Sequence, residues 1–328
     1  MSTWSSADTW TGRLFLFDRE RARLDLLPRS AAMPVDIGKS AFARGLVVPF
    51  THEPLRPEED ELLELAPEAE GLALVAVGEA RKTITSRQFD ARLQSRFGDR
   101  ATTRAEQDLV RDELLTEADT RIAGNTGLFD LRLGIALLPN ALAHDEWIRD
   151  ILLNACAIAL EGLTTRLIPA LLASWVLGEA PVPPPFMPGR SIALESPSDG
   201  SMSSFSGCLS TSDDIQAQIV ERRRLPVRMT LLNADIELEL RDPFAVRVSI
   251  EHSGLRTLRK EASSASSAAQ HRAYLQALAS RMRDVLAWVI AHVSASPDTT
   301  RWQHPAGQRD DLLRMIGHQP DGVICHDA

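Results

Sequence analysis

Arginine is the residue type in this chain whose spacing could do chemistry. One group lies at the junction of an expected short helix and an expected strand and comprises Arg222, Arg223, Arg224 and Arg228. A second group, with one member per turn of an expected helix, comprises Arg92, Arg96, Arg100 and Arg104. A guanidinium stays charged and donates paired hydrogen bonds to phosphate oxygens, and such a row can follow a phosphate backbone. The chemistry that these residues suggest is therefore phosphate binding.

Both groups also have an ordinary structural explanation. The helical row could pair with acids close to it in sequence, namely Asp90, Asp99 or Glu106. The arginines at 222–224 end a short helix, where cations offset exposed backbone carbonyls, although three in succession exceed what a cap needs. Spacing alone leaves phosphate contact and structural pairing open in both places.

Sequence motifs for catalysis, metal binding or cofactor binding are absent or weak. The chain has no glycine-rich dinucleotide or P-loop motif and no G-x-S-x-G nucleophile turn. The acids at 58–65 lack the regular spacing of ligands in a cation-binding loop. The acids near His144 are typical of the start of a helix. The spacing of His318, Cys325 and His326 matches no standard zinc pattern. We therefore expect no catalytic residue, no metal site and no cofactor.

Composition limits the class of protein. The chain has 328 residues, 44% of them hydrophobic, enough to bury one large core or two medium ones. No apolar run is long enough for a membrane span and the N-terminus does not resemble a secretion signal, so we expect a cytoplasmic protein without a membrane partner. Three widely spaced cysteines fit a reducing compartment. A net charge of −9 does not favour nucleic acid, yet a basic groove can lie on an acidic body.

Helical and strand patterns are interleaved without regular βαβ alternation, which predicts an α+β fold. We divide the chain into a flexible N-terminus (1–12), an N-terminal part (13–177), a connector rich in Pro, Ser and Gly without regular structure (178–210), a C-terminal part (211–295) and an extension (296–328). Within the N-terminal part, Thr85 with Gln88 and Thr103 with Glu106 have the spacing of helix capping boxes.

Periodicity predicts which side chains are buried. The second capped helix is expected to bury Leu109, Val110 and Leu114, and the helix that follows His144 to bury a stripe of Trp147, Ile151, Ala155 and Ile158. In the C-terminal part, alternation places Ile236, Leu238 and Leu240 in the core and Asp235, Glu237 and Glu239 in water. A long closing helix is expected to bury Leu275, Leu278, Met282, Val285, Val289 and Val293.

Taken in order, several segments resemble the recombination-associated protein family RdgC. The stretches are "GKSAFARGLVVPF", "LALVAVGEARKTITSRQFDARLQSR" with "AEQDLVRDELL", "LLASWV", "STSDDIQAQIVERRRLPVRMTLLNADIELELRDPFAVRVSI" and "YLQALASRMRDVLAWVIAHV". The resemblance runs from about Arg13 to His292 and rests on order, length and spacing rather than on one motif. It implies a horseshoe-shaped protomer that pairs at both ends into a ring-shaped homodimer.

The resemblance also implies a function. A ring of this kind would hold double-stranded DNA in a basic central hole without reading its sequence, and would modulate recombination by RecA-type recombinases on the nucleoid. The residues expected to contact DNA are Arg81, Lys82, Arg92, Arg96, Arg222, Arg223, Arg224, Arg228 and Arg247.

The sequence departs from the family pattern in the finger. Glu117 and Asp119 stand about where the family has arginine and phenylalanine, and "SGCLS" replaces a basic stretch before the helix near Ser212. An acid facing phosphate weakens binding, and a lost aromatic removes a stacking contact. We expect DNA binding that is weaker than in the family or lost.

Two other functions stay open. The first is a divergent protein-interaction subunit of a mobile-element or phage-defence system, which would have kept the fold and the dimer. The second is an enzyme with the acids near Glu58 or the histidine and cysteine tail as its site. Steeply salt-dependent duplex binding, binding to a protein partner alone, or bound metal and turnover would separate the three.

Overall fold

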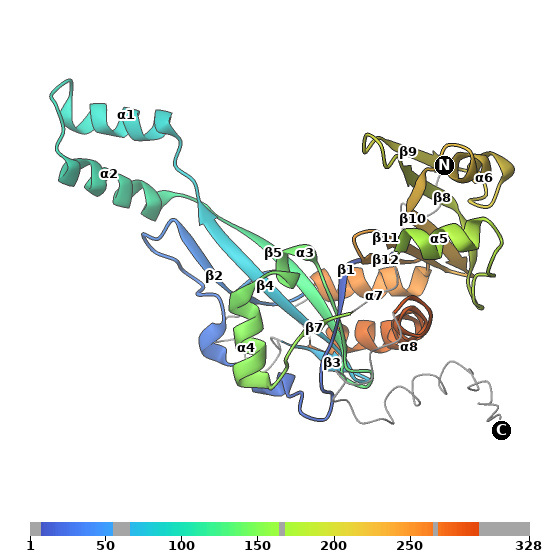
Figure 1. The fold of residues 1–328 in the computed structure, drawn as a ribbon. Coiled ribbons are helices and arrows are strands. Elements are labelled where there is room, and N and C mark those ends of the chain that lie inside the picture. The colour runs from blue at the N-terminus through green and yellow to red at the C-terminus, as the bar shows by residue number, and fades with distance from the viewer. Residues whose placement is uncertain (1–7, 55–65, 164–167, 265–267, 295–328) are drawn as a thin grey trace.

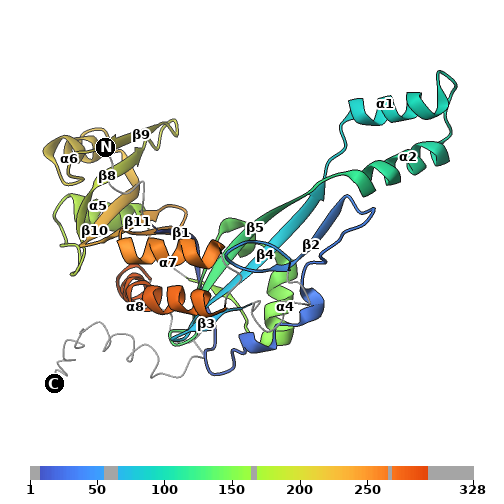
Figure 2. The same cartoon turned by 180° about the vertical axis from the view of Figure 1, so that it is seen from behind.

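The computed structural model of the protein describes residues 8–54, 66–163, 168–264 and 268–294. Two arms project from the same side of a central body, a helical hairpin at one end and a small tip of strands and one helix at the other (Figure 1; Figure 2 from behind). Helices and antiparallel strands are mixed, which confirms the α+β expectation. In the ranges given, every helix is too short or too polar to cross a bilayer.

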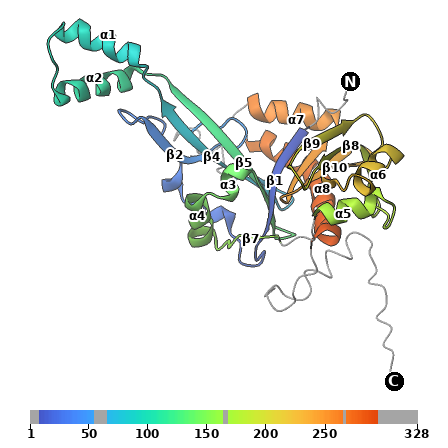
Figure 3. The ribbon, with the colours of Figure 1, turned by 45° about the horizontal axis from the view of Figure 1, so that its top comes forward.

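Strand β1 (Asp8–Leu16) belongs to two sheets. Its residues Asp8–Gly12 pair with β12, and Arg13–Leu16 pair with β6. The first sheet continues along the order β6-β5-β4-β2 and contains β2 (Phe42–Val47), β3 (Glu68–Ala69), β4 (Leu72–Lys82), β5 (Thr120–Asp130), β6 (Ile135–Leu138) and β7 (Glu161–Gly162). The second sheet continues along β12-β11-β10-β8-β9 and contains β8 (Met187–Glu195), β9 (Met202–Ser206), β10 (Leu225–Asn233), β11 (Ile236–Arg241) and β12 (Ala245–Ile250). Figure 3 shows β1 running between the two halves.

The helices pack on or project from these sheets. They are α1 (Ser86–Phe97), α2 (Arg104–Glu117), α3 (Asn140–Ala143), α4 (Glu146–Cys156), α5 (Ile168–Val176), α6 (Asp213–Val220), α7 (Ser253–Ser264) and α8 (Ala268–Val293), with short 3-10 turns η2 (Leu24–Leu26) and η3 (Arg29–Ala31). Both capping boxes form as the sequence predicts: Thr85 and Gln88 cap α1, and Thr103 and Glu106 cap α2.

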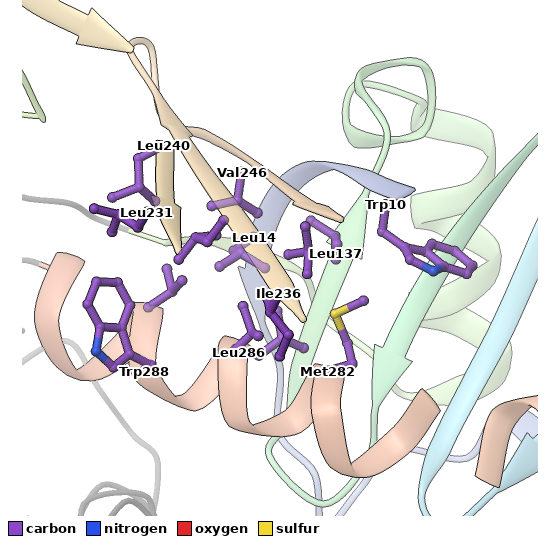
Figure 4. Close-up of a cluster of buried hydrophobic side chains, with 14 of the residues drawn as sticks. Trp10, Leu14, Leu137, Leu231, Ile236, Leu240, Val246, Met282, Leu286 and Trp288 are labelled. Carbon is purple, nitrogen blue, oxygen red and sulfur yellow. The ribbon is translucent and has the colours of Figure 1, made fainter. Parts of the chain in front are cut away.

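The main core lies between helices α5, α7 and α8 and a continuous surface formed by the second sheet and one face of the first. The stripe predicted for α8 is buried throughout, as are Ile236, Leu238 and Leu240 on β11. Figure 4 shows strand residues such as Leu14 and Val246 above Met282 and Leu286 of α8. Trp288 is 2% exposed and its Nε1 donates to the carbonyls of Pro183 and Pro184 at 3.2 Å each. Burial of each large apolar side chain stabilises the fold by about 1.5–3 kcal/mol.

A second core covers the opposite face of the first sheet. Helix α4 buries Ile148, Leu152 and Cys156 there, together with Phe15 and Phe129 of the sheet. Of the predicted stripe, Ile158 is buried as expected, but the prediction was wrong for Trp147, Ile151 and Ala155, which are only half-buried. Burial raises the pKa of the Cys156 thiol to about 11, so this thiol is an unreactive core group.

Two expected boundaries were wrong. Strand β1 begins at Asp8, inside the segment expected to be flexible, because Asp8–Gly12 find their partners on β12. The expected connector contains β8 and β9, and Ile192 and Leu194 of β8 are fully buried in the main core. The high content of proline and serine led to the prediction of irregular structure. Strands form there because apolar residues alternate along the segment and neighbouring strands supply hydrogen-bond partners. The extension expected at 296–328 lies outside the described residues.

A buried ion pair ties α8 to the first sheet. Arg283 Nε donates to Asp130 Oδ2 at 2.9 Å, and the Asp130 carboxylate also accepts the backbone N–H groups of Arg132 and Leu133. Burial raises the pKa of Asp130, while these donors oppose the shift. Removing one partner of such a buried pair is strongly destabilising, so the contact fixes the first sheet against the helices of the second.

Candidate nucleic-acid interface

The helical arm positions the first arginine group. Strands β4 and β5 pair along their full lengths, and they carry α1 and α2 at their far end as a protruding hairpin (Figure 1). Helix α1 buries no side chain, whereas α2 buries Val110, Leu114 and Leu115. The prediction for Leu109 was wrong, since this side chain is 44% exposed on the outer face of α2.

The arginines of α1 are paired with glutamates of α2. Arg92 Nη2 lies 2.5 Å from Glu117 Oε2, and Arg96 pairs with Glu113. Arg100, just beyond α1, lies 2.5 Å from Glu106. The hydrogen bond from Arg100 is the main cause that lowers the pKa of Glu106 to about 2. Three of the four arginines in the row, Arg92, Arg96 and Arg100, therefore have a carboxylate at contact distance, while Arg104 is exposed.

One of these partners is among those the sequence suggested, since Glu106 holds Arg100, whereas the other two are not. Asp90 and Asp99 do not pair with the row, and Glu113 and Glu117 take the role because antiparallel packing brings the two helices together. Glu117, expected to face DNA in place of a basic residue, holds Arg92 instead. Asp119 is exposed just before β5.

The root of the hairpin contains the next two predicted residues. Arg81 is exposed, pairs with Glu79 at 2.8 Å and lies 5.5 Å from the Phe42 ring. The Lys82 ammonium points inward and donates to the carbonyls of Gly38 and Leu115 at 2.8 Å each. Lys82 is 9% exposed, so the structure gives it a role in holding α2 to the sheet.

The second arginine group lies at the tip. Helix α6 ends as expected before Arg222, and Arg223 adopts a left-handed backbone with φ of 51°. The Arg224 N–H donates to the Gln218 carbonyl near the helix end, and the left-handed conformation at Arg223 is one that glycine usually adopts after a helix. Arg222 and Arg223 are exposed, while Arg224 is half-buried and donates to Ser203 Oγ on β9.

Arg228 and Arg247 share one face of the second sheet. Strand register places Arg228 opposite Arg241, and Arg247 opposite both Glu239 and Thr11. This is the face opposite the main core. Side chains alternate along a strand, and the chain neighbours Met229, Val246 and Val248 are buried in the main core. Arg228 also donates to Ser204 Oγ of β9 at 3.2 Å.

The structure adds Arg13 to this set. Alternation along β1 puts Thr9, Thr11 and Arg13 on the same face as Arg247, while Trp10 and Leu14 enter the main core. No local pattern indicates this placement, because the pairing of β1 with β12 joins segments that are far apart in the chain. We call the face that bears Arg13, Arg228, Arg241 and Arg247 the arginine face.

The arginines of this face are poorly satisfied. Arg13, Arg228 and Arg247 are half-buried, and the Nε of each is buried without a hydrogen-bond partner. Among the described residues none of the three has a carboxylate in ion-pair contact. A charge removed from water without a partner is costly, and an anion bound there would relieve that cost.

Two glutamates lie on the arginine face. Glu239 was expected in water, yet it is 7% exposed and pairs with Arg241. Burial raises the pKa of Glu237, and the nearby charge of Arg247 opposes that shift. On strands β1, β10, β11 and β12 the face thus carries four arginines against two glutamates, with a net positive charge.

No protein-family model matches this chain, and no curated protein is similar to it. Among the described residues no three His, Cys, Asp or Glu side chains gather as metal ligands. The candidates near Glu58 and in the tail at His318, Cys325 and His326 lie outside the described ranges.

Proposed function

We propose that this protein binds double-stranded DNA without reading its sequence, as a non-enzymatic homodimeric ring of the RdgC type that modulates recombination on the nucleoid. The observation that carries the proposal is the set of half-buried arginines without acid partners on the arginine face. Phosphate contacts supply affinity without sequence information, which suits guanidinium groups spread over a sheet.

The proposal moves the DNA contact away from the helical hairpin. Arg92 and Arg96 are neutralised by Glu117 and Glu113, and Lys82 is turned inward. The arginine face, with Arg222 and Arg223 exposed beside it on the tip, is the better candidate for phosphate contact. Both arms project from the same side of the body, as a protomer that surrounds a rod would need (Figure 2).

A salt titration tests the proposal. We expect a short random-sequence duplex to bind in fluorescence anisotropy with an affinity that falls steeply as salt rises, while light scattering gives the mass of a dimer. Each neutralised phosphate adds about 0.9 to the slope of log K against log salt, so contacts by Arg13, Arg222, Arg223, Arg228 and Arg247 give a slope of roughly −4.5 per protomer. A folded dimer that does not bind duplex would overturn the proposal.

One observation favours the alternative of a protein-interaction subunit. Large apolar side chains are exposed on the tip: Met187, Met202, Leu209, Val220 and Leu225. Leu225 and Met202 flank Glu195 in one row across β10, β8 and β9, and β9 is the last strand of the sheet order. Exposed apolar groups at a sheet edge are typical of protein contacts. Substituting Leu225 and Met202 by serine would abolish partner capture on this alternative and leave duplex affinity unchanged.

A further inference from the structure

A pocket of about 340 Å³ lies where β1, the α3–α4 connection, β7 and the β11–β12 turn meet. Three of its lining residues can carry positive charge: Arg13, His144 and Arg149. Its apolar wall includes Leu163, Pro243 and Phe244. Among the residues that the structure describes, no aspartate or glutamate lines it.

Arg13 is the anomalous member of this lining. It is half-buried, and its Nε is buried without a hydrogen-bond partner. The backbone of β1 is fixed at this point by strand pairing, since Gly12 pairs with Val246 of β12 and Arg13 pairs with Leu138 of β6. The strand therefore holds the guanidinium at the pocket without supplying an acid to neutralise it.

Arg149 and His144 are exposed, and acids close to them in sequence are engaged or lie outside the pocket lining. Arg149 donates from Nη2 to the Leu160 carbonyl at 3.0 Å, which orients its guanidinium and leaves further N–H donors. Asp145 is buried and pairs with Arg44. Glu161 and Asp242 adjoin lining residues in the chain, are exposed, and do not line the pocket.

We propose that this pocket binds a phosphate group, held by Arg13 and Arg149 with His144 at its rim. Planar guanidinium groups match the geometry of phosphate oxygens, and an acid-free lining excludes cations. The volume is at the small end of the range for ligand pockets, roughly 300–1,000 Å³. The part of the ligand that enters the pocket with the phosphate is therefore small. Phe244 and Pro243 provide the apolar side against which that body would rest.

The phosphate could belong to a DNA backbone or to a free anion. Arg13 also lies on the arginine face, so the first source rests on the proposed function and the second does not. Competition separates them: at constant ionic strength, inorganic phosphate displaces a duplex whose backbone occupies the pocket. Without displacement, the pocket serves a free phosphate-bearing ligand.

The test is calorimetric titration of the full chain with inorganic phosphate, against chloride at equal ionic strength. We expect saturable binding that Arg13→Gln and Arg149→Gln each weaken about tenfold, because each loses hydrogen bonds to a charged group. Arg21→Gln is the matched control, since the Arg21 side chain is 80% exposed, lies outside the pocket lining and pairs with Asp18.

The outcomes are distinct from those for duplex binding. Absence of phosphate binding by the unaltered chain, or equal binding by Arg149→Gln and Arg21→Gln, overturns the pocket. Arg149 is exposed, so this variant keeps the test valid if Arg13→Gln fails to fold. Phosphate binding without duplex binding supports the pocket and rejects the proposed function, whereas duplex binding without phosphate binding does the reverse.

Discussion

The helical hairpin and the arginine face are both rich in arginine, but they treat that charge in opposite ways. In the hairpin, Arg92 and Arg96 of α1 each meet a glutamate of α2. On the arginine face, Arg13, Arg228 and Arg247 are half-buried with an unpartnered Nε. The comparison teaches that a run of cations predicts an anion site only where the fold brings no acid to it.

The energetics of the two regions differ in the same sense. Exposed ion pairs such as those of the hairpin contribute about 0–1 kcal/mol each, and salt screens them further. A guanidinium that is partly removed from water without a partner lowers stability, so its retention calls for a compensating ligand. This contrast gives four predictions.

The largest effect is expected on the arginine face. Changing Arg228 and Arg247 together to Gln should weaken duplex binding on the order of 100-fold, since each loses a charged hydrogen bond to phosphate. The salt slope in fluorescence anisotropy should also fall by about two. The matched control, Arg92→Gln with Arg96→Gln, should leave affinity unchanged, and the opposite ranking of the two double variants would reverse the comparison.

Freeing the hairpin arginines should have the converse effect. Glu113→Gln with Glu117→Gln removes the carboxylates that hold Arg96 and Arg92. If the hairpin lies beside DNA, duplex affinity should rise and the salt slope should steepen by up to about two. An unchanged slope in the same titration would place the hairpin away from the duplex.

Lys82 separates structure from binding at the root of the hairpin. Lys82→Met should lower the free energy of unfolding by about 1–3 kcal/mol, because the Gly38 and Leu115 carbonyls lose their donor. Urea denaturation measures this loss. Lys39→Met is the control, since that side chain is 65% exposed and pairs with Asp112 at the surface. A drop in duplex affinity without a stability change would return Lys82 to the DNA site.

The smallest effect is a pH dependence at the hairpin tip. The pKa of Glu106 is about 2 in the folded state against an ordinary 4.5, chiefly because of Arg100. Since the folded pKa is depressed, this contact stabilises the fold above pH 4.5 and the contribution is lost as the pH falls towards 2. NMR titration of the Glu106 carboxyl should show this pKa, and Arg100→Gln should raise it. A titration near 4.5 in the unaltered chain would show that the pair does not persist in solution.

Local rules were sufficient for much of the fold. Three features could be predicted because they involve residues that are close in sequence. They are the capping boxes at Thr85 and Thr103, the buried stripe of α8 and the hairpin of β11 with β12. Composition failed at 178–210, where proline and serine concealed β8 and β9. Those strands form because β10 supplies their hydrogen-bond partners and the core accepts Ile192 and Leu194.

The sequence by itself determined the α+β class, the helix starts and the positions of the arginines. Only the tertiary structure decided which arginines are neutralised, because ion pairs such as Arg92 with Glu117 form between helices rather than along one. It also decided that Arg13 and Arg247 share one face of the sheet, since β1 pairs with β12 although the two strands are far apart in the sequence. Charge is written locally in a sequence, whereas its compensation depends on contacts that form only when distant segments pack together.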